Sequence, residues 1–347
     1  MISSGSAVGW SAWFLAAYVG AAAATAWLVG WAASLGVIDR PNDRSSHTRA
    51  TPRGGGISIV AITTWAAIIA SVIWPAGRRG LAAVAVPALA IAAVSWLDDL
   101  KPLRNRVRFG VHLAAAAATT ALLAPVRDVD LGSFGRLELA AAAWPLTLIW
   151  IIGMTNAFNF MDGIDGIAGI TAAAAGGAIA AAAASLGVEP VAAVALAFAG
   201  GAAGFLACNW PPARIFIGDV GSAFCGFMIA ALPLATGSAA VGRVTAITAV
   251  TMWPFIFDTL FTLGRRLIRR ENIFHAHRSH IYQRLVIAGW SHRAVSSLYG
   301  GLSAMAAAVA VAPLRNACPE QTATHLAAAM VLVGIGLLLT LVHIQEA

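Results

Sequence analysis

The sequence predicts an all-α polytopic membrane protein, and three observations carry that prediction. Hydrophobic residues make up 59% of the 347 positions, while charged residues make up only 11%. A soluble globular domain carries about 25% charged residues, and the mean hydropathy here is +0.79. The apolar residues also fall into about eleven runs, most of them near the ~20 residues that a helix needs to cross a bilayer.

The apolar runs form one domain over residues 1–347, with no break that suggests a second domain. The first run has no Lys or Arg before Arg40, so it lacks the basic start of a cleavable signal peptide and is expected to remain as a helix. The three cysteines form no CxxC pair and predict no redox or metal role. We place the spans at 8–35, 57–74, 81–97, 110–126, 139–156, 165–185, 191–208, 222–237, 243–264, 294–312 and 323–344.

The basic residues are unevenly distributed between the loops on the two sides of these spans. Sixteen of the 22 Lys and Arg fall in one alternating set of loops, which the positive-inside rule makes cytoplasmic. The N-terminus is then external and the C-terminus cytoplasmic. The net charge of +7 mainly reports topology, with attraction for anionic lipid or substrate as a second use, and nucleic acid is not indicated. The cytoplasmic set is 36–56, 98–109, 157–164, 209–221 and 265–293.

The first cytoplasmic loop combines arginines, including Arg53, with the triple glycine 54–56 and with His47. Glycine exposes backbone N–H groups at the start of a helix, where an anion such as phosphate is favoured. A loop that is basic only because it is cytoplasmic would explain the arginines equally well. Gly55 and Arg53 are therefore candidate phosphate-binding residues.

The adjacent acids Asp98 and Asp99 end the third span. Neighbouring carboxylates repel each other unless a cation lies close, and Mg²⁺ with phosphate ligands is the usual partner of such pairs. In the alternative interpretation, Asp98 caps a loop and Asp99 pairs with Lys101. Two adjacent acids alone are weak evidence for a metal site. The prediction therefore depends on the other acids of the cytoplasmic side.

The stretch 156–169 carries two amides and two carboxylates directly after an apolar run. Such groups are costly at a membrane helix end because lipid offers them no partners. Asn156, Asn159, Asp162 and Asp165 therefore predict a ligand site, with a polar turn between helices as the alternative. Glycines follow both acids and allow the backbone to approach a ligand closely.

Two later loops repeat this chemistry. Asp219 lies between glycines at the start of a helix, which suits a metal ligand near a diphosphate, although a simple helix cap is the alternative. Asp258 lies near several arginines and is expected to form an ion pair with them. The loop 275–284 contains three histidines without zinc-protease spacing, and its basic neighbours favour diphosphate oxygens as partners.

Together, five motifs in this order over residues 39–285 resemble the bacterial polyprenyl-phosphate N-acetylhexosamine-1-phosphate transferases of glycosyltransferase family 4. The His-x-His-Arg-Ser-His form is most similar to the O-antigen-initiating branch and departs from the histidine run of the muramoyl-pentapeptide branch. Pro102 stands where some members carry a third acid. The resemblance implies a multi-helix protein of the bacterial inner membrane. It also implies transfer of a sugar-1-phosphate from a UDP-sugar to undecaprenyl phosphate, with release of UMP and with Mg²⁺ or Mn²⁺.

The resemblance also assigns roles to residues of this sequence. It implies a metal site, acids at the phosphates, a uridine pocket with a stacking Phe216, and a histidine loop that holds the sugar diphosphate. The metal candidates are Asn159 and Asp219; the catalytic candidates are Asp98, Asp99, Asp162, Asp165, His277 and His280; the substrate-binding candidates are His47, Arg53, Gly55, Asn156, Asn209, Phe216, His275 and Arg278.

Several alternatives remain open at this stage. A proton- or ion-coupled transporter also places acids among membrane helices, but it usually holds them near the midplane and often shows repeated halves. Phosphoryl transfer can proceed by direct attack or through an aspartyl-phosphate. The identity of the sugar and the existence of a homodimer are not determined by the sequence.

Overall fold

The computed structural model describes residues 7–34, 37–39, 50–272 and 278–346, and helices dominate this part of the chain. Short 3-10 turns flank several helices, and four short strands form two antiparallel pairs, β1–β2 and β3–β4. The strands are β1 Ile38–Asp39, β2 Thr51–Pro52, β3 Asp128–Asp130 and β4 Arg136–Glu138. The helices are α1 Ala7–Ser34, α2 Ile57–Ile73, α3 Arg78–Leu100, α4 Asn105–Leu123, α5 Ala143–Met161, α6 Ile167–Ser185, α7 Glu189–Asn209, α8 Gly218–Ala231, α9 Val241–Thr251, α10 Trp253–Ile268, α11 Ile281–Ile287, α12 His292–Val311 and α13 Glu320–Glu346.

The helices confirm an all-α polytopic membrane protein. Eight helical segments of the described residues are long and apolar enough to span a membrane, and α9 with α10, which are bent by 68° relative to each other, make a ninth span if taken together. Neither the 17-residue α2 nor α4, which carries Arg106 and Arg108 in its first turn, belongs to these eight. The predicted count of eleven is therefore not confirmed, although each of the eleven predicted ranges contains a helix.

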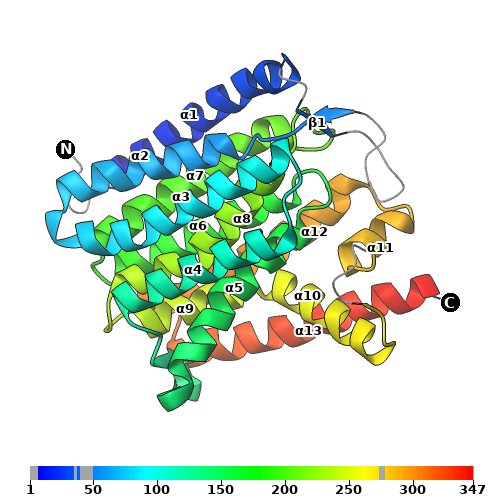
Figure 1. Cartoon of the computed structure of the whole chain (residues 1–347). Helices are drawn as coiled ribbons and strands as arrows, with labels where there is room; N and C mark the ends of the chain where they lie inside the picture. Colours follow the sequence, from blue (N-terminus) through cyan, green and yellow to red (C-terminus); the bar gives the residue numbers. More distant parts are fainter. Residues whose placement is uncertain (1–6, 35–36, 40–49, 273–277, 347) are drawn as a thin grey trace.

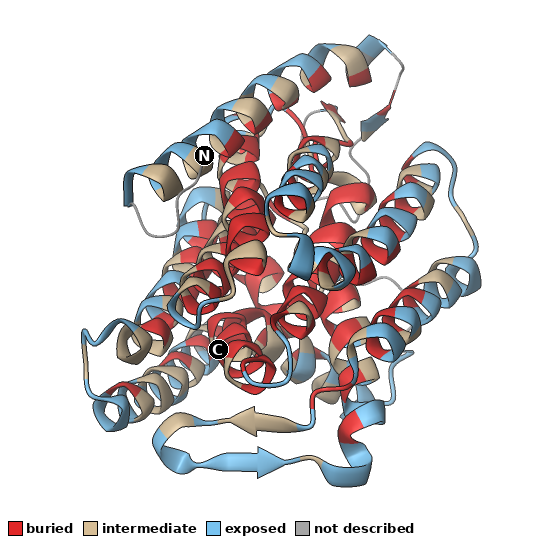
Figure 2. Ribbon diagram, turned by 90° about the vertical axis from the view of Figure 1, so that its left-hand side faces the viewer, coloured by how far each residue is buried: buried red, intermediate tan, exposed pale blue. Residues whose placement is uncertain are grey.

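The centre of the bundle consists of α6, α7 and α8, whose residues are mostly buried, whereas most residues of α1 and α13 lie outside the core (Figure 2). Small residues allow the central backbones to approach closely. A Cβ atom at Gly176 of α6 would lie 2.9 Å from the backbone nitrogen of Ala199, and one at Gly226 of α8 would lie 2.8 Å from the carbonyl of Met154. The Ala- and Gly-rich runs thus form the packing surfaces of the bundle.

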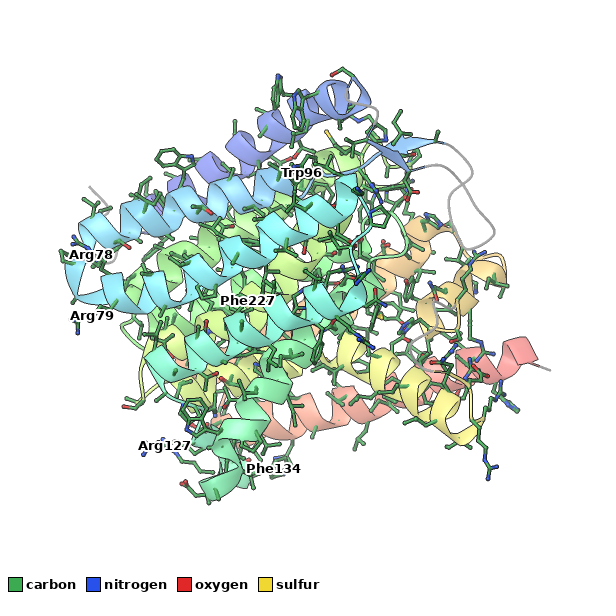
Figure 3. All side chains as sticks on the ribbon, in the orientation of Figure 1. Arg78, Arg79, Trp96, Arg127, Phe134 and Phe227 are labelled. Atoms are coloured by element: carbon green, nitrogen blue, oxygen red, sulfur yellow. The ribbon has the colours of Figure 1, made fainter. Side chains whose placement is uncertain are left out.

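The long helices lie side by side, so their ends gather at two faces of the molecule (Figure 1). α3 spans the distance between these faces, with Arg78 at one end and Trp96 near the other (Figure 3). The hairpin β3–β4, residues 128–138, lies at the same face as the start of α3, and we call this face the hairpin end. The opposite face, which we call the polar end, is defined by Asp98, Arg108, Asn159, Asp162, Asp165 and Asp219.

Candidate active site

Arg108 joins two carboxylates at the polar end. One of its guanidinium nitrogens lies 2.8 Å from Oδ2 of Asp98, and the other lies 2.8 Å from Oδ2 of Asp219. These residues come from α4, α3 and the first turn of α8. The amide nitrogen of Asn159, on α5, donates to Oδ1 of Asp219 (3.1 Å) and to Oγ of Ser222 (2.9 Å). Four helices therefore meet around one charged cluster, as the sequence predicted for Asp98, Asn159 and Asp219.

Asp99 lies beside this cluster but has a different environment. Its carboxylate is buried and accepts hydrogen bonds from the backbone N–H groups of Asp219 (3.1 Å) and Val220 (3.0 Å). A carboxylate at a helix N-terminus satisfies otherwise unpaired N–H groups and is favoured by the helix dipole. Gly218, with φ of +74°, leaves room for it, because a Cβ atom there would lie 2.7 Å from Oδ2 of Asp99. Asp99 thus fixes the start of α8, and its predicted catalytic role stays a prediction.

Arg53 reaches Asp99 from the loop before α2. Its guanidinium donates to the backbone carbonyl of Asp99, and its Nε lies 3.9 Å from the carboxylate. Arg53 therefore adds one positive charge to the edge of the cluster. His47, the other side-chain candidate of this loop, lies outside the described residues.

The triple glycine does not offer its amides to a phosphate in the way the sequence suggested. The N–H groups of Gly55 and Gly56 donate to the carbonyls of Phe216 (2.9 Å) and Ile217 (2.8 Å). The N–H of Phe216 in turn donates to the carbonyl of Pro52 at 2.8 Å. The glycines are needed for close backbone packing, because a Cβ atom at Gly56 would lie 2.8 Å from the carbonyl oxygen of Ile217. The glycine loop 54–56 thus joins the segment before α2 to the segment before α8 at the polar end.

Asp165 and Asn209 hold two loops of the polar end together. Asp165 Oδ2 accepts from the N–H of Ala213 (3.0 Å), and Oδ1 lies 3.4 Å from Nδ1 of His292. The side chain of Asn209 accepts from the N–H of Gly166 and donates to a backbone carbonyl, both at 2.9 Å. These bonds give Asp165 and Asn209 a structural role, and whether either also contacts a uridine remains a prediction.

Asp162 is the acid of the polar end whose environment is most unfavourable to a negative charge. It is partly buried in the loop after α5. Burial, followed by repulsion from Asp219, Asp99 and Asp165, raises the pKa of Asp162 well above its usual range. The polar end thus holds more carboxylates than the neighbouring arginines neutralise, which favours the entry of a cation.

Asp258 is fully buried and organises the segment that follows the histidine loop. It accepts hydrogen bonds from the hydroxyl of Tyr299 (2.7 Å), the N–H groups of Ile281 (2.9 Å) and Tyr282 (3.1 Å), and Nδ1 of His280 (3.0 Å). Among the residues that the structure describes, these partners take the place of the arginines with which Asp258 was predicted to form an ion pair, so that prediction is wrong. His280 is itself buried and hydrogen-bonded to Asp258, which gives it a structural role, and its predicted catalytic role stays a prediction.

Tyr282 connects this segment to the acidic loop. Its hydroxyl donates to the carbonyl of Phe160 at 3.1 Å and leaves no room for a Cβ atom at Gly163. Arg278 lies at the start of the same segment and is partly exposed. His275 and His277 lie outside the described residues, so their predicted roles stay predictions.

Asn156 lies one helical turn deeper than Asn159. Its amide donates to the carbonyl of Ile152 (2.7 Å), and the buried His112 of α4 lies close to its side chain. His112 follows Arg108 by four residues, so the two lie on one face of α4. Asn156 and His112 form a polar layer beneath the charged cluster, and the predicted substrate contact of Asn156 stays a prediction.

Sequence reasoning missed Arg108, His292 and Tyr282. Arg108 was hidden among the basic residues of loop 98–109, where the positive-inside rule already accounted for its charge. Arg108 lies in the first turn of the helix that follows the Asp98–Asp99 pair. A short loop folds that turn back onto the pair, so this position could have identified Arg108 as a site residue.

The residues of the polar end fit a magnesium ion. Among the residues that the structure describes, no three His, Cys, Asp or Glu side chains converge as a preformed metal cage. Mg²⁺ usually binds through one or two carboxylates, waters and substrate phosphates. Asp98 and Asp219 face a common cation, the guanidinium of Arg108, and the side-chain amide of Asn159, whose nitrogen donates to Asp219, lies beside them. This donor set suits a hard divalent cation completed by phosphate.

Known proteins provide an independent comparison. A family model described as glycosyl transferase family 4 matches residues 81–237. The chain is 34% identical over 265 residues to a Bacillus subtilis protein named probable undecaprenyl-phosphate N-acetylglucosaminyl 1-phosphate transferase, covering 76% of this chain and 73% of that one. It is 30% identical over 345 residues to decaprenyl-phosphate N-acetylglucosaminephosphotransferase of Mycobacterium tuberculosis, covering 90% and 84%. It is also 30% identical over 298 residues to a phospho-N-acetylmuramoyl-pentapeptide-transferase of Synechococcus, covering 78% and 81%.

Proposed function

The chain belongs to the polyprenyl-phosphate N-acetylhexosamine-1-phosphate transferase family, and from that premise we propose that its donor is a UDP-N-acetylhexosamine. The acceptor is undecaprenyl phosphate, UMP is released, and the product starts a lipid-linked cell-surface glycan such as O-antigen. Two of the relatives above are named for N-acetylglucosamine, which makes UDP-N-acetylglucosamine the first donor to test.

One observation carries this proposal: Asp98 and Asp219 share Arg108 at one end of a membrane bundle, beside the under-neutralised Asp162. A transporter would hold such groups near the midplane. Here they lie where α3 and α5 end and where α4 and α8 begin, which favours a reaction at the membrane surface.

Both reactants are anions, so catalysis depends on positioned positive charge. We assign to Arg108 and Arg53 the neutralisation of phosphate oxygens, and to Asp98 the positioning of the acceptor phosphate. Mg²⁺, when bound, supplies further charge neutralisation at the diphosphate, and Asp98, Asp219 and Asn159 are the residues that would hold it. Mn²⁺ suits the same oxygen donors.

The step itself is a direct displacement. An oxygen of the lipid phosphate attacks the β-phosphorus of the UDP-sugar, the bond from that phosphorus to the bridging oxygen breaks, and UMP leaves with the electron pair. The alternative is a two-step path through an aspartyl-phosphate. Exchange of labelled UMP into the UDP-sugar without lipid would identify the two-step path, and no exchange is expected for direct attack.

The distribution of basic residues supports a cytoplasmic polar end, an external N-terminus and a cytoplasmic C-terminus. Cys318 provides a native probe of this orientation, because it lies between α12 and α13 and is partly exposed, whereas Cys208 and Cys225 are buried. A membrane-impermeant maleimide should label intact cells at Cys318. Labelling only after the membrane is opened would reverse the proposed orientation.

The function is tested by measuring UMP released by the purified protein. Release should require UDP-N-acetylglucosamine or a related UDP-sugar, undecaprenyl phosphate and Mg²⁺ together. Release of UDP instead of UMP, or release without the lipid phosphate, would contradict the proposal.

A further inference from the structure

Arg108 is the cation that this structure places between Asp98 and Asp219. Its two terminal nitrogens contact carboxylates of different helices, each at 2.8 Å, and its side chain is largely shielded, with 23% exposed. Asp98 and Asp219 are also largely shielded, with 11% and 32% of their side chains exposed. Charge-assisted contacts of this length and shielding are the strong class of hydrogen bond.

These contacts compete with a divalent cation. A metal ion between Asp98 and Asp219 would need the carboxylate oxygens that Arg108 contacts. Each of these oxygens can bind either Arg108 or the metal ion at full strength, but not both. Any free energy in the Arg108 contacts must therefore be given up when a cation enters between Asp98 and Asp219. The surrounding acids Asp99 and Asp162 attract the cation but do not remove this competition.

A phosphate ligand changes the balance, because guanidinium pairs with phosphate as readily as with carboxylate. A donor diphosphate near Asp219 would offer Arg108 a new partner and release the carboxylates. By thermodynamic linkage, the factor by which bound donor tightens cation binding equals the factor by which bound cation tightens donor binding.

We infer that Arg108 is a resident counter-ion that keeps the free protein's affinity for divalent cations low and couples cation entry to binding of the nucleotide-sugar. The inference rests on the proposed function for the identity of the anionic ligand. In the free protein, Arg108 occupies the carboxylates of Asp98 and Asp219. The donor and the cation then bind together.

The test measures binding of Mn²⁺ alone to the full-length purified protein, from the loss of the free-ion electron paramagnetic resonance signal. The variants are Arg108→Gln, Arg108→Lys, and Arg106→Gln as the matched control, since Arg106 is an exposed arginine of the same helix turn. Without substrate, Arg108→Gln should bind Mn²⁺ about tenfold more tightly than the wild type, and Arg106→Gln should equal the wild type.

Adding UDP-N-acetylglucosamine should tighten Mn²⁺ binding by the wild type and tighten it much less in Arg108→Gln. Arg108→Lys retains the charge but cannot contact both carboxylates as a fork, so an intermediate affinity is expected. This variant keeps the test valid if the thermal unfolding of Arg108→Gln shows a damaged fold.

Equal Mn²⁺ affinity of the wild type and both Arg108 variants without substrate would overturn the inference, as would weaker binding by Arg108→Gln. That outcome is distinct from failure of the proposed function, which is read from UMP release by the wild type. UMP release with equal Mn²⁺ affinities would leave the function intact and remove only the role given to Arg108.

Discussion

The two ends of the molecule contain charge clusters of the same composition. At the polar end, Arg108 lies between Asp98 and Asp219. At the hairpin end, Arg243 of α9 lies 3.3 Å from Asp130 and 2.7 Å from Glu320. Each cluster has one arginine and two acids from different elements. An arginine that joins two carboxylates is therefore not by itself a mark of an active site.

The surroundings of the two clusters differ. The carboxyl groups of Asp99 and Asp162 lie close to Asp219, so the Arg108 cluster has further acids beside its own two. Around Arg243, Glu320 is half exposed, and Asp130 also accepts from the backbone of its own turn at Gly132. The neighbouring cavity, about 380 Å³ between α9 and α13, is lined mainly by apolar side chains. A larger number of carboxyl groups in a shielded polar setting distinguishes the polar end, the proposed active site, from the hairpin end.

Matched removal of one acid from each cluster should give the largest difference. Asp219→Asn should lower the rate of UMP release about 1,000-fold or more, because it removes a phosphate- and cation-organising charge. Asp130→Asn should leave the rate within about twofold. Rates are measured with purified protein at saturating substrates, and comparable losses in both variants would contradict the distinction.

Matched removal of each arginine should give the next largest effect. Arg108→Gln should lower transfer about 100-fold, since a positioned charge on the phosphates is lost. Arg243→Gln should leave transfer unchanged and cost about 1 kcal/mol of stability or less, because one of its partners is half exposed. Turnover and thermal unfolding of the two variants are compared side by side. A loss of transfer in Arg243→Gln would connect the hairpin end to catalysis.

Asp258 tests how far the polar end depends on its support. In the wild type, the carboxylate of Asp258 accepts hydrogen bonds from backbone N–H groups. In Asp258→Asn, the amide NH₂ would face these donors, so we expect a loss of about 2–3 kcal/mol in stability. Transfer should fall about tenfold or more, because the segment with Arg278 and Tyr282 shifts relative to the acidic loop. The milder Tyr299→Phe, which removes one hydrogen bond, should cost about 1 kcal/mol. Unaltered transfer in Asp258→Asn would show that this segment is not positioned by Asp258.

Asp162 should give the smallest effect on stability, and the effect should depend on pH. Because burial and neighbouring acids raise its pKa in the fold, Asp162 contributes stability below its unfolded pKa and loses that contribution as the pH rises through the folded pKa. Asp162→Asn should therefore unfold at a slightly higher temperature at neutral pH, with the gain disappearing in acid. Asp128→Asn, in the hairpin, serves as the control and should show no such gain.

The convergence of polar segments could be predicted from the sequence, because alternating spans and the positive-inside rule assign loops to faces. Asp98, Asn159 and Asp219 meet for that reason. The separate roles of Asp98 and Asp99 could not be predicted, since the N–H groups that Asp99 caps lie about 120 residues further along the chain. The pairing of Gly55 with Phe216 and of Asp258 with His280 likewise depends on tertiary packing. The predicted count of eleven spans is not confirmed at α2 and α4, because α2 has only 17 residues and α4 begins with Arg106 and Arg108.

The most direct test of the central claim follows the β-phosphorus of the donor. UDP-N-acetylglucosamine labelled with ³²P at the β-position is incubated with the purified protein, Mg²⁺ and undecaprenyl phosphate, and the lipid and nucleotide fractions are separated. Sugar-1-phosphate transfer at the polar end predicts that the label moves to the lipid in the wild type and in Asp130→Asn, but not in Asp219→Asn. Label that stays in the nucleotide fraction as UDP, or that moves equally in Asp219→Asn, would contradict it.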